Sequence, residues 1–519
     1  MILQRYASQL QFLALLFLGV GLSTSVFLMS VGGILFSIAW ISFPYLKNRI
    51  AIGIRSPYVI LSATLFLLHL VALLWTEDYK YAFNDIRIKI PLLLFPLFFA
   101  SSPQPEPKKL KHLLALIVAA TLISTLISFG IYLKWLPVSK DISDIRNISP
   151  FVSHIRLSLV VCVSVVLLWW LRLKHRMIPA FTAIAINLWF IYFLYLIESA
   201  TGIFILCSTA LLFGCVLAYQ SSQRWIKIGI PVVLLAGLLF ILLSIQKSIL
   251  ELRKPKEDPK TFALQSDDGC YYTHYRDNTM LENGYYTWSH LCLQELEQAW
   301  NERSKISFDG NDKKGQRIYG TIVRYLTSKG LHKDRKGVYA LDNEDIHHIE
   351  NGIANVNYVQ KSGLKRRLEE IVFEIDSYLT NNYYTGNSLT QRFEFWSTGI
   401  GIFRENIWAG VGTGDAQLAF DRAYEKKESP LPKNNRLRSH NQFIAMGVAF
   451  GLPGIVLFIF FAFYPFARAL KEKNIVFLLF YSGALISFFT EDTLETQAGI
   501  TYFCFFTGLF SYFSETKKI

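Results

Sequence analysis

The chain has 519 residues, of which 52% are hydrophobic and 15% aromatic, and its mean hydropathy is +0.31. So apolar a composition argues against a soluble protein of this length and favours a polytopic membrane protein. The formal net charge of +13 does not indicate a nucleic-acid-binding protein, because the basic residues are divided between membrane sides rather than gathered on one face.

Apolar runs close to the roughly 20 residues that cross a bilayer recur along the chain. They predict an all-α fold with about twelve transmembrane helices. The expected spans are 9–24, 26–46, 57–75, 88–102, 112–133, 154–171, 178–197, 201–219, 227–246, 441–467, 475–490 and 498–513. The first run is not expected to be a cleaved signal peptide, because only Ser23, Thr24 and Ser25 separate it from the second.

The fourth expected span is short and contains Pro91 and Pro96, so a re-entrant hairpin is an alternative at this position. The distribution of charge favours a full span. With a cytoplasmic N-terminus, twelve spans place the basic loops inside and the mixed or acidic short loops outside. Without the fourth span, the cluster of Lys108, Lys109 and Lys111 would lie outside. We therefore expect both termini in the cytoplasm.

Polarity divides the chain into four regions. They are a nine-helix membrane region at 1–246, a mostly helical outer domain at 247–391, an interfacial segment at 392–440 and three C-terminal spans within 441–519. Cys270 and Cys292 share the outer domain, where an oxidising compartment would allow a disulfide. The spacing leaves two free thiols as the alternative, and no spacing in the chain indicates a metal site.

Candidate functional residues crowd the end of the outer region, next to an apolar run. Residues 390–405 have the pattern of an amphipathic helix at the membrane interface and include Arg392. A glycine-rich turn contains Gly412 and Gly414, whose backbone N–H groups can approach an anion. His440 stands at the head of the next span, as an interfacial cap or as a general base near its unperturbed pKa of about 6.5.

Several short motifs follow one another in this region. They are an Arg-x3-Trp pair at Arg392 and Trp396, the glycine turn at 410–414, a polar loop, His-Asn-Gln-Phe from His440, and Gly-Leu-Pro-Gly from Gly451. In this order and topology the whole chain resembles the O-antigen ligase and O-antigen polymerase family. Residues 282–284, 300–301, 324–328 and 489–492 look like the version found in Bacteroidetes-type bacteria.

The resemblance implies a metal-independent glycosyltransferase of the GT-C type, without a cofactor, at the periplasmic face of the bacterial inner membrane. The donor would be a glycan on undecaprenyl pyrophosphate. In ligases the acceptor is a sugar hydroxyl of lipid A–core, and in polymerases it is another lipid-linked repeat. Carried over by motif, Arg392 would bind the donor pyrophosphate, and His440 would deprotonate or position the acceptor hydroxyl.

The chain departs from the family at one point. Members often have Ser-Arg-Gly at the outer end of the eighth span, whereas the stretch around Thr201 contains no arginine. Arg156, with His154 close by, lies at the outer end of the sixth span, either as an interface anchor or as a donor-binding residue. Arg438 is a further candidate, although a basic loop near anionic headgroups needs no catalytic reason.

The preferred interpretation is an O-antigen ligase. An O-antigen polymerase and a protein O-glycosylating ligase on the same scaffold stay open, because the donor chemistry is shared and the sequence does not identify the acceptor. A transporter of lipid-linked sugars is less expected, since the chain has no internal repeat and no paired interrupted helices.

Overall fold

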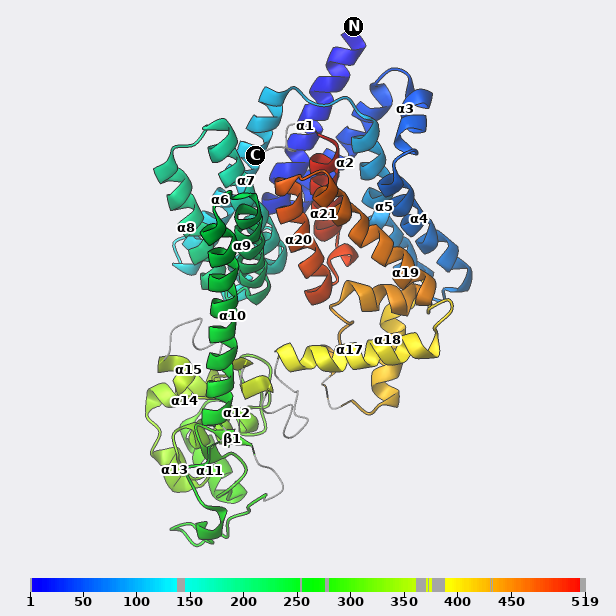
Figure 1. Cartoon of the computed structure of the whole chain (residues 1–519). Coiled ribbons are helices and arrows are strands. Elements are labelled where there is room, and N and C mark those ends of the chain that lie inside the picture. The colour runs from blue at the N-terminus through cyan, green and yellow to red at the C-terminus, as the bar shows by residue number, and fades with distance from the viewer. Residues whose placement is uncertain are drawn as a thin grey trace. The chain divides into compact units, whose positions relative to one another are not determined.

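The computed structural model describes residues 2–137, 145–252, 254–275, 280–360, 370–371, 373–375, 388–429, 431 and 433–513. The chain forms two compact units (Figure 1). The first unit combines Met1–Pro231 with Phe395–Ile519, and the second unit is Val232–Glu394. The divisions fall inside two helices, α10 (Arg224–Leu252) and α17 (Ser388–Glu405).

The described part of the first unit is almost entirely helical. Its helices are α1 (Ile2–Thr24), α2 (Val26–Ser42), α3 (Leu46–Gly53), α4 (Pro57–Val71), α5 (Tyr79–Ser101), α6 (Pro107–Tyr132), α7 (His154–His175), α8 (Ala180–Leu196), α9 (Ala200–Gln220), α18 (Ala416–Lys426), α19 (Gln442–Lys471), α20 (Ile475–Thr490) and α21 (Gln497–Tyr512). Short 3-10 helices are η1 (Ala72–Trp75), η2 (Ile145–Ile148), η4 (Lys433–Asn435) and η5 (Thr493–Glu495).

A helix lies at each of the twelve positions where a span is expected. Within the described ranges, six helices are long and apolar enough to cross a membrane, and the bent pair α2–α3 would make a seventh. The helices α8 and α20 are apolar but shorter. The all-α fold and the presence of several membrane-capable helices are therefore confirmed, while the number twelve stays a prediction.

The fourth expected span is one continuous helix rather than a hairpin, because α5 continues through Pro91 and Pro96. Proline has no backbone N–H, so Pro96 cannot donate to the carbonyl of Leu92, four residues before it. In an apolar environment that carbonyl needs another donor. The buried hydroxyl of Ser62, on α4, donates to it at 2.5 Å. Helix α5 thus keeps its backbone satisfied at the proline.

The second expected span, 26–46, ends earlier than predicted. Helix α2 stops at Ser42, and α3 starts after a bend of 117°. Tyr45 takes a left-handed conformation at the bend, with φ of 58°. The buried guanidinium of Arg49 donates to the carbonyl of Trp40 at 2.7 Å and to that of Ser101 at 3.2 Å. It thereby satisfies carbonyls that the ends of α2 and α5 leave open.

Side chains cap the starts of several helices of the first unit. Asp78, Ser153, Ser199, Asn441 and Thr496 accept hydrogen bonds from the first backbone N–H groups of α5, α7, α9, α19 and α21. Such caps are needed because the first N–H groups of a helix have no partner within it. In the predicted topology all five starts lie on the outer side of the membrane.

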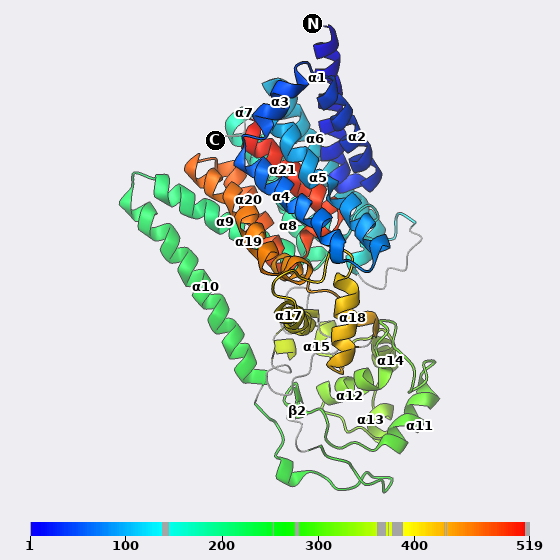
Figure 2. The ribbon, with the colours of Figure 1, turned by 90° about the vertical axis from the view of Figure 1, so that its right-hand side faces the viewer.

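Helix α21 forms the middle of the first unit. Its residues 499–511 are all buried, and it packs against α1, α2, α5, α7 and α20. Because these residues are buried on every side of the helix, the neighbouring helices surround it within the first unit. Figure 2 shows α21 behind α4 in the bundle. The turn that leads into α21 is consequently held in place by several neighbouring helices.

The second unit is mostly helical in its described part. It contains η3 (Pro259–Thr261), α11 (Leu293–Arg303), α12 (Ile318–Ser328), α13 (Arg335–Tyr339), α14 (Asn343–Glu350) and α15 (Asn357–Gln360), with a two-stranded antiparallel sheet of β1 (Leu281–Glu282) and β2 (Tyr285–Tyr286). Its core includes Leu296, Trp300, Ile322, Leu326 and Ile349. The unit therefore has a hydrophobic core of its own.

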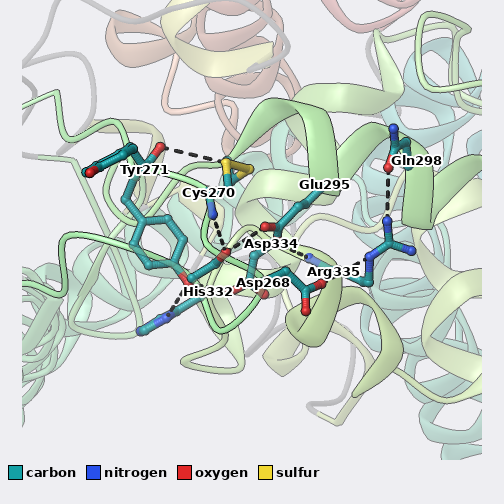
Figure 3. Close-up of a disulfide and its surroundings, with 11 residues drawn as sticks. Asp268, Cys270, Tyr271, Glu295, Gln298, His332, Asp334 and Arg335 are labelled. Carbon is teal, nitrogen blue, oxygen red and sulfur yellow. Dashed lines mark hydrogen bonds and ion pairs between the residues drawn. A yellow bond between two sulfur atoms is a disulfide. The ribbon is translucent and has the colours of Figure 1, made fainter.

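Cys270 and Cys292 form a disulfide, one of the two alternatives that their spacing left open (Figure 3). Cys292 precedes the first turn of α11. The carboxylate of Glu295, in that turn, accepts a hydrogen bond from the hydroxyl of Ser266 at 2.6 Å. The disulfide and this bond attach the loop at 266–270 to the start of α11.

Residues of the outer-domain motifs form a buried polar network inside the second unit. Glu282 is 1% exposed and pairs with the guanidinium of Arg324. Its other carboxylate oxygen accepts from Asn355 at 2.6 Å, and Asn283 donates to the carbonyl of Ser328 at 2.8 Å. Buried charges of this kind require such partners. These motif residues therefore hold the second unit together.

A second group of buried polar side chains in this unit, around Lys333, is in surroundings that disfavour its charged forms. Lys333 is 3% exposed, and its Nζ donates to the carbonyl of Tyr286 at 3.1 Å. Burial lowers the pKa of Lys333 to about 7. The ring of His290 stacks on that of His332 with centroids 4.1 Å apart, and burial lowers the pKa of His290 to about 3. Burial thus disfavours the charged forms of all these groups.

We predict that Lys333→Met stabilises the second unit at pH 7. The folded-state pKa of Lys333 lies below its unfolded value. The free energy of unfolding therefore decreases as the pH falls from about 10.5 towards 7. Hydrogen exchange of the full-length protein should slow by roughly tenfold or more in α11 and α12. The control is Lys336→Met, since Lys336 is an exposed partner of Asp267. Faster exchange in Lys333→Met than in the wild type would contradict the prediction.

Candidate functional site

Ionisable side chains of the first unit meet at one end of its helices. They come from the first half of α5, the start of α7, the loop before α19 and the turn between α20 and α21 (Figure 1). The carboxylates are Asp85, Glu491, Asp492 and Glu495, and the cationic side chains are Lys89, Arg156, Arg438 and His440. We call these eight residues the charge cluster.

His440 lies at the edge of the charge cluster, just before α19. Its backbone is left-handed, with φ of 46°. The imidazole Nδ1 lies 3.5 Å from Glu491 Oε2 and 3.7 Å from Asp492 Oδ1. This nitrogen is buried and has no hydrogen-bond partner among the described residues. The geometry therefore places His440 against two carboxylates without a close bond to either.

The environment of His440 shifts its pKa away from the value of an isolated imidazole. Burial disfavours the imidazolium, but the carboxylates of Asp492 and Glu491 outweigh it and raise the pKa of His440 to about 9. Burial also opposes ionisation of Asp492, yet His440, Arg438 and Arg156 together hold its pKa well below the usual range. At neutral pH His440 is consequently a cation, rather than a base that titrates near pH 6.5.

Arg438 faces the charge cluster instead of serving only as a basic loop residue. Its Nη2 lies 3.7 Å from Asp492 Oδ2, and its Nη1 lies 3.7 Å from Glu495 Oε2. A shorter contact runs from its Nη1, which donates to the hydroxyl of Tyr81 at 2.8 Å. Arg436, by contrast, donates to backbone carbonyls of its own loop. Of these two arginines, Arg438 is the one that contacts the cluster.

Arg156 is buried within the protein, with 8% of its surface exposed, which contradicts the alternative of an interface anchor reaching towards water. Its Nε donates to the hydroxyl of Thr496 at 3.1 Å. Its Nη1 is buried without a hydrogen-bond partner in the described part of the chain. His154, the other candidate here, begins α7 two residues earlier.

The start of α7 lies beside the stretch around Thr201, where the family's arginine is missing. The hydroxyl of Ser158 on α7 donates to that of Ser199, the cap of α9, at 2.8 Å. Gly202 allows the close approach, since a Cβ there would lie 2.9 Å from Ser158. Arg156 is therefore positioned on the helix that neighbours the arginine-free stretch.

Arg392 lies in the part of α17 that belongs to the second unit. The donor-binding role that its motif implies stays a prediction.

The glycine turn makes hydrogen bonds within the protein. The amides of Val411 and Gly412 donate to the carbonyls of Val448 at 2.9 Å and Ala449 at 3.0 Å. The amide of Gly414 faces the hydroxyl of Thr76 at 3.4 Å. In this conformation the N–H groups of Gly412 and Gly414 donate to other parts of the protein, and the anion-binding role expected of them stays a prediction.

The carbonyls that receive these bonds belong to a break in α19. Gly451 interrupts the helix with φ of 63° and ψ of −152°. A break of this kind leaves carbonyls of the preceding turn without their helical donors. The glycine turn supplies the donors, and Gly410 permits the contact because a Cβ there would lie 2.3 Å from the backbone of Ala449 and Phe450.

Sequence reasoning missed the tightest part of the charge cluster. Lys89 Nζ lies 2.5 Å from Asp85 Oδ1 and 2.8 Å from Glu495 Oε2. The available signal was a lysine inside an expected span, four residues after an aspartate, because intramembrane charges are rarely unpaired. The sequence marks Glu491 and Asp492 as outer-loop charges and as part of the 489–492 motif, but it does not pair them with His440.

A small cavity of about 20 Å³ adjoins the cluster. Its lining includes His69, Lys89, Arg438, Asp492 and Glu495. A volume of this size accommodates about one water molecule. The cavity is too small for a sugar ring.

His440, Glu491 and Asp492 also present three possible metal-ligand atoms within 4.8 Å of one another. A metal ion at this position would require a deprotonated His440. It would also compete with Arg438 for Asp492. The arrangement fits a network of oppositely charged side chains better than a metal centre.

Comparison with known families supports the resemblance that the motifs indicate. Residues 351–459 match the family model described as O-antigen ligase. The matched segment contains Arg392, the glycine turn, His440 and the break at Gly451. No curated protein matches the chain. Residues 351–459 are thus similar to the O-antigen ligase family, which suggests, in general terms, a glycan-transferring membrane enzyme.

Gly410→Ala should destabilise the first unit by about 2 kcal/mol or more, because the new Cβ would collide with α19 and the backbone has φ of 66°. The measurement is the thermal unfolding midpoint of the purified protein in detergent. Gly401→Ala is the matched control, since Gly401 is helical with nothing within 4 Å of its added Cβ. The control should unfold at the wild-type midpoint or above it. Equal midpoints for Gly410→Ala and the wild type would refute the close approach.

Proposed function

We propose that this protein is an O-antigen ligase, which transfers a glycan from undecaprenyl pyrophosphate to lipid A–core at the periplasmic face of the inner membrane. One observation supports this more specific function. His440 Nδ1 and Arg156 Nη1 are both buried without a hydrogen-bond partner among the described residues, and both side chains act electrostatically on Asp492. Unused donors of this kind are expected where an anion binds during a reaction.

The looseness of the surrounding ion pairs supports donor binding. Arg438 and His440 lie 3.5–3.7 Å from their carboxylates, whereas charge-assisted hydrogen bonds have lengths of about 2.7–2.9 Å. A diphosphate can therefore gain short bonds to these cations without first breaking short bonds within the protein. Arginine suits this task because it binds phosphate oxygens in pairs and keeps its proton.

Arg156 would supply the second arginine that the stretch around Thr201 lacks. The contact between Ser158 and Ser199 brings its helix to the start of α9. Arg392, from the Arg-x3-Trp motif, would add a further contact to the donor pyrophosphate. The positive charge of these residues would take the place of a metal ion at the leaving group.

In the proposed reaction, the oxygen of an acceptor hydroxyl forms a bond with the anomeric carbon of the glycan. The bond between that carbon and the diphosphate oxygen breaks, and its electron pair leaves with the diphosphate. Arg156, Arg438 and the imidazolium of His440 stabilise this developing charge. The hydroxyl proton passes to the carboxylate of Glu491, since His440 already carries a proton and the cations around Asp492 hold the pKa of that carboxyl too low for it to act as a base.

His440→Ala and Arg156→Gln should each reduce glycan transfer by about 100-fold or more, because each removes a cation from the leaving group. The test is a lipopolysaccharide gel of a deletion strain complemented with each variant. Loss of long chains, with lipid-linked glycan accumulating, is expected. Arg422→Gln is the control, because Arg422 pairs with Glu77 on the surface. A deletion strain with one repeat attached to the core would instead identify a polymerase.

Transfer by the purified enzyme should be nearly constant from about pH 6 to 8 and decline above the His440 pKa of about 9. The rate should fall with rising pH because the cationic form of His440 is the active one, and its raised pKa keeps the imidazolium charged up to that pH. His440→Lys should keep part of the activity and move the decline upwards, towards the lysine pKa of about 10.4. A rate that climbs with pH up to about 9 would show that His440 is the base instead.

A further inference from the structure

Lys89 contacts the charge cluster from a helix that the proposed mechanism does not use. Its side chain is 1% exposed, and its contacts at 2.5 Å to Asp85 and 2.8 Å to Glu495 are the shortest ion pairs of the cluster. Asp85 belongs to the same helix, one turn earlier, whereas Glu495 lies in the turn before α21. Lys89 therefore ties α5 to the turn that carries Glu491 and Asp492.

Glu495 is the point where three parts of the cluster meet. Its Oε2 binds Lys89 and lies 3.7 Å from Arg438 Nη1. Its Oε1 accepts a hydrogen bond from Gln442 Nε2 at 3.0 Å, and the carbonyl oxygen of that amide accepts from the backbone of Leu494 at 2.8 Å. One carboxylate oxygen is thus shared unequally between a lysine and an arginine.

Stability alone does not account for this arrangement. Taking an ion triad out of water has a desolvation cost that often exceeds the gain from pairing, and apolar replacements of such groups are frequently neutral or stabilising. The feature to explain is the inequality of the two contacts of Glu495, one tight and one loose. It has a direct consequence for Arg438, because a carboxylate held by Lys89 neutralises the arginine less.

We propose that Lys89 is a positioning residue that competes with Arg438 for Glu495 and so keeps the Arg438 guanidinium available to the anionic donor. This inference rests on the proposed function, since it assigns the anion to a lipid-linked diphosphate. Without the lysine charge, Glu495 has only a short distance to close before it pairs fully with Arg438. The donor must then displace a buried carboxylate, which weakens its binding.

The test compares Lys89→Met, Glu495→Gln, the double variant and, as control, Lys109→Met. Lys109 is a half-exposed partner of Glu106 in the first turn of α6, whereas Lys89 is buried. Lys89→Met should raise the donor KM by roughly tenfold or more, with a smaller effect on kcat. Adding Glu495→Gln removes the competing charge and should return the KM to within about threefold of the wild type. A merely structural role for Lys89 predicts no such rescue.

Glu495→Gln by itself should leave the donor KM equal to that of the wild type or lower, because Arg438 loses a competitor. If Lys89→Met does not accumulate as folded protein, the donor KM of Glu495→Gln tests the inference. The inference is overturned by a double variant no better than Lys89→Met, or by a KM that rises in Glu495→Gln. Thermal unfolding midpoints of all variants in detergent show whether the fold is intact.

These outcomes are distinct from a failure of the proposed function. Absence of glycan transfer by the wild type, or full activity of His440→Ala and Arg156→Gln, contradicts the proposed function. Missing rescue in a protein whose wild type transfers glycan, and whose His440→Ala and Arg156→Gln variants do not, contradicts only the role of Lys89.

Discussion

Charges buried at the ends of apolar helices must compensate one another, and this constraint organises the first unit. An ionised group in a low-dielectric interior is costly unless an opposite charge lies close to it. The charge cluster meets the requirement with four carboxylates and four cationic side chains. Its two kinds of contact differ: Lys89 is held at 2.5 and 2.8 Å, while Arg438 and His440 stay at 3.5–3.7 Å. The tight contacts anchor the turn before α21, and the loose ones leave donors for a substrate.

The same environment constrains the backbone, because a carbonyl in an apolar region also needs a partner. Two interruptions of regular helix illustrate this rule. At Pro96 the carbonyl of Leu92 is satisfied by a serine from the neighbouring helix. At Gly451 the carbonyls of Val448 and Ala449 are satisfied by the glycine turn. The turn that sequence patterns associate with anions is thus needed first to complete α19, next to His440.

The second unit is stabilised by its own core, a disulfide and the buried pair of Glu282 and Arg324. The motif residues of the outer region form hydrogen bonds and an ion pair inside this unit. They therefore explain its fold rather than the proposed reaction. The catalytic proposal accordingly depends on the first unit, with Arg392 as the motif residue that lies outside it.

The sequence by itself determined the helical class, the positions of the apolar helices and the value of Arg156, Arg438 and His440 as candidates. These follow from local information, since hydrophobic runs, prolines and isolated charges are visible along one stretch of chain. Tertiary structure alone decided that Glu491 and Asp492 surround His440, and that the glycine turn completes a broken helix. It also decided that Lys89 meets Glu495 across a separation of 406 residues. Such partners are chosen by packing and by the need to neutralise buried charge, neither of which a linear pattern records.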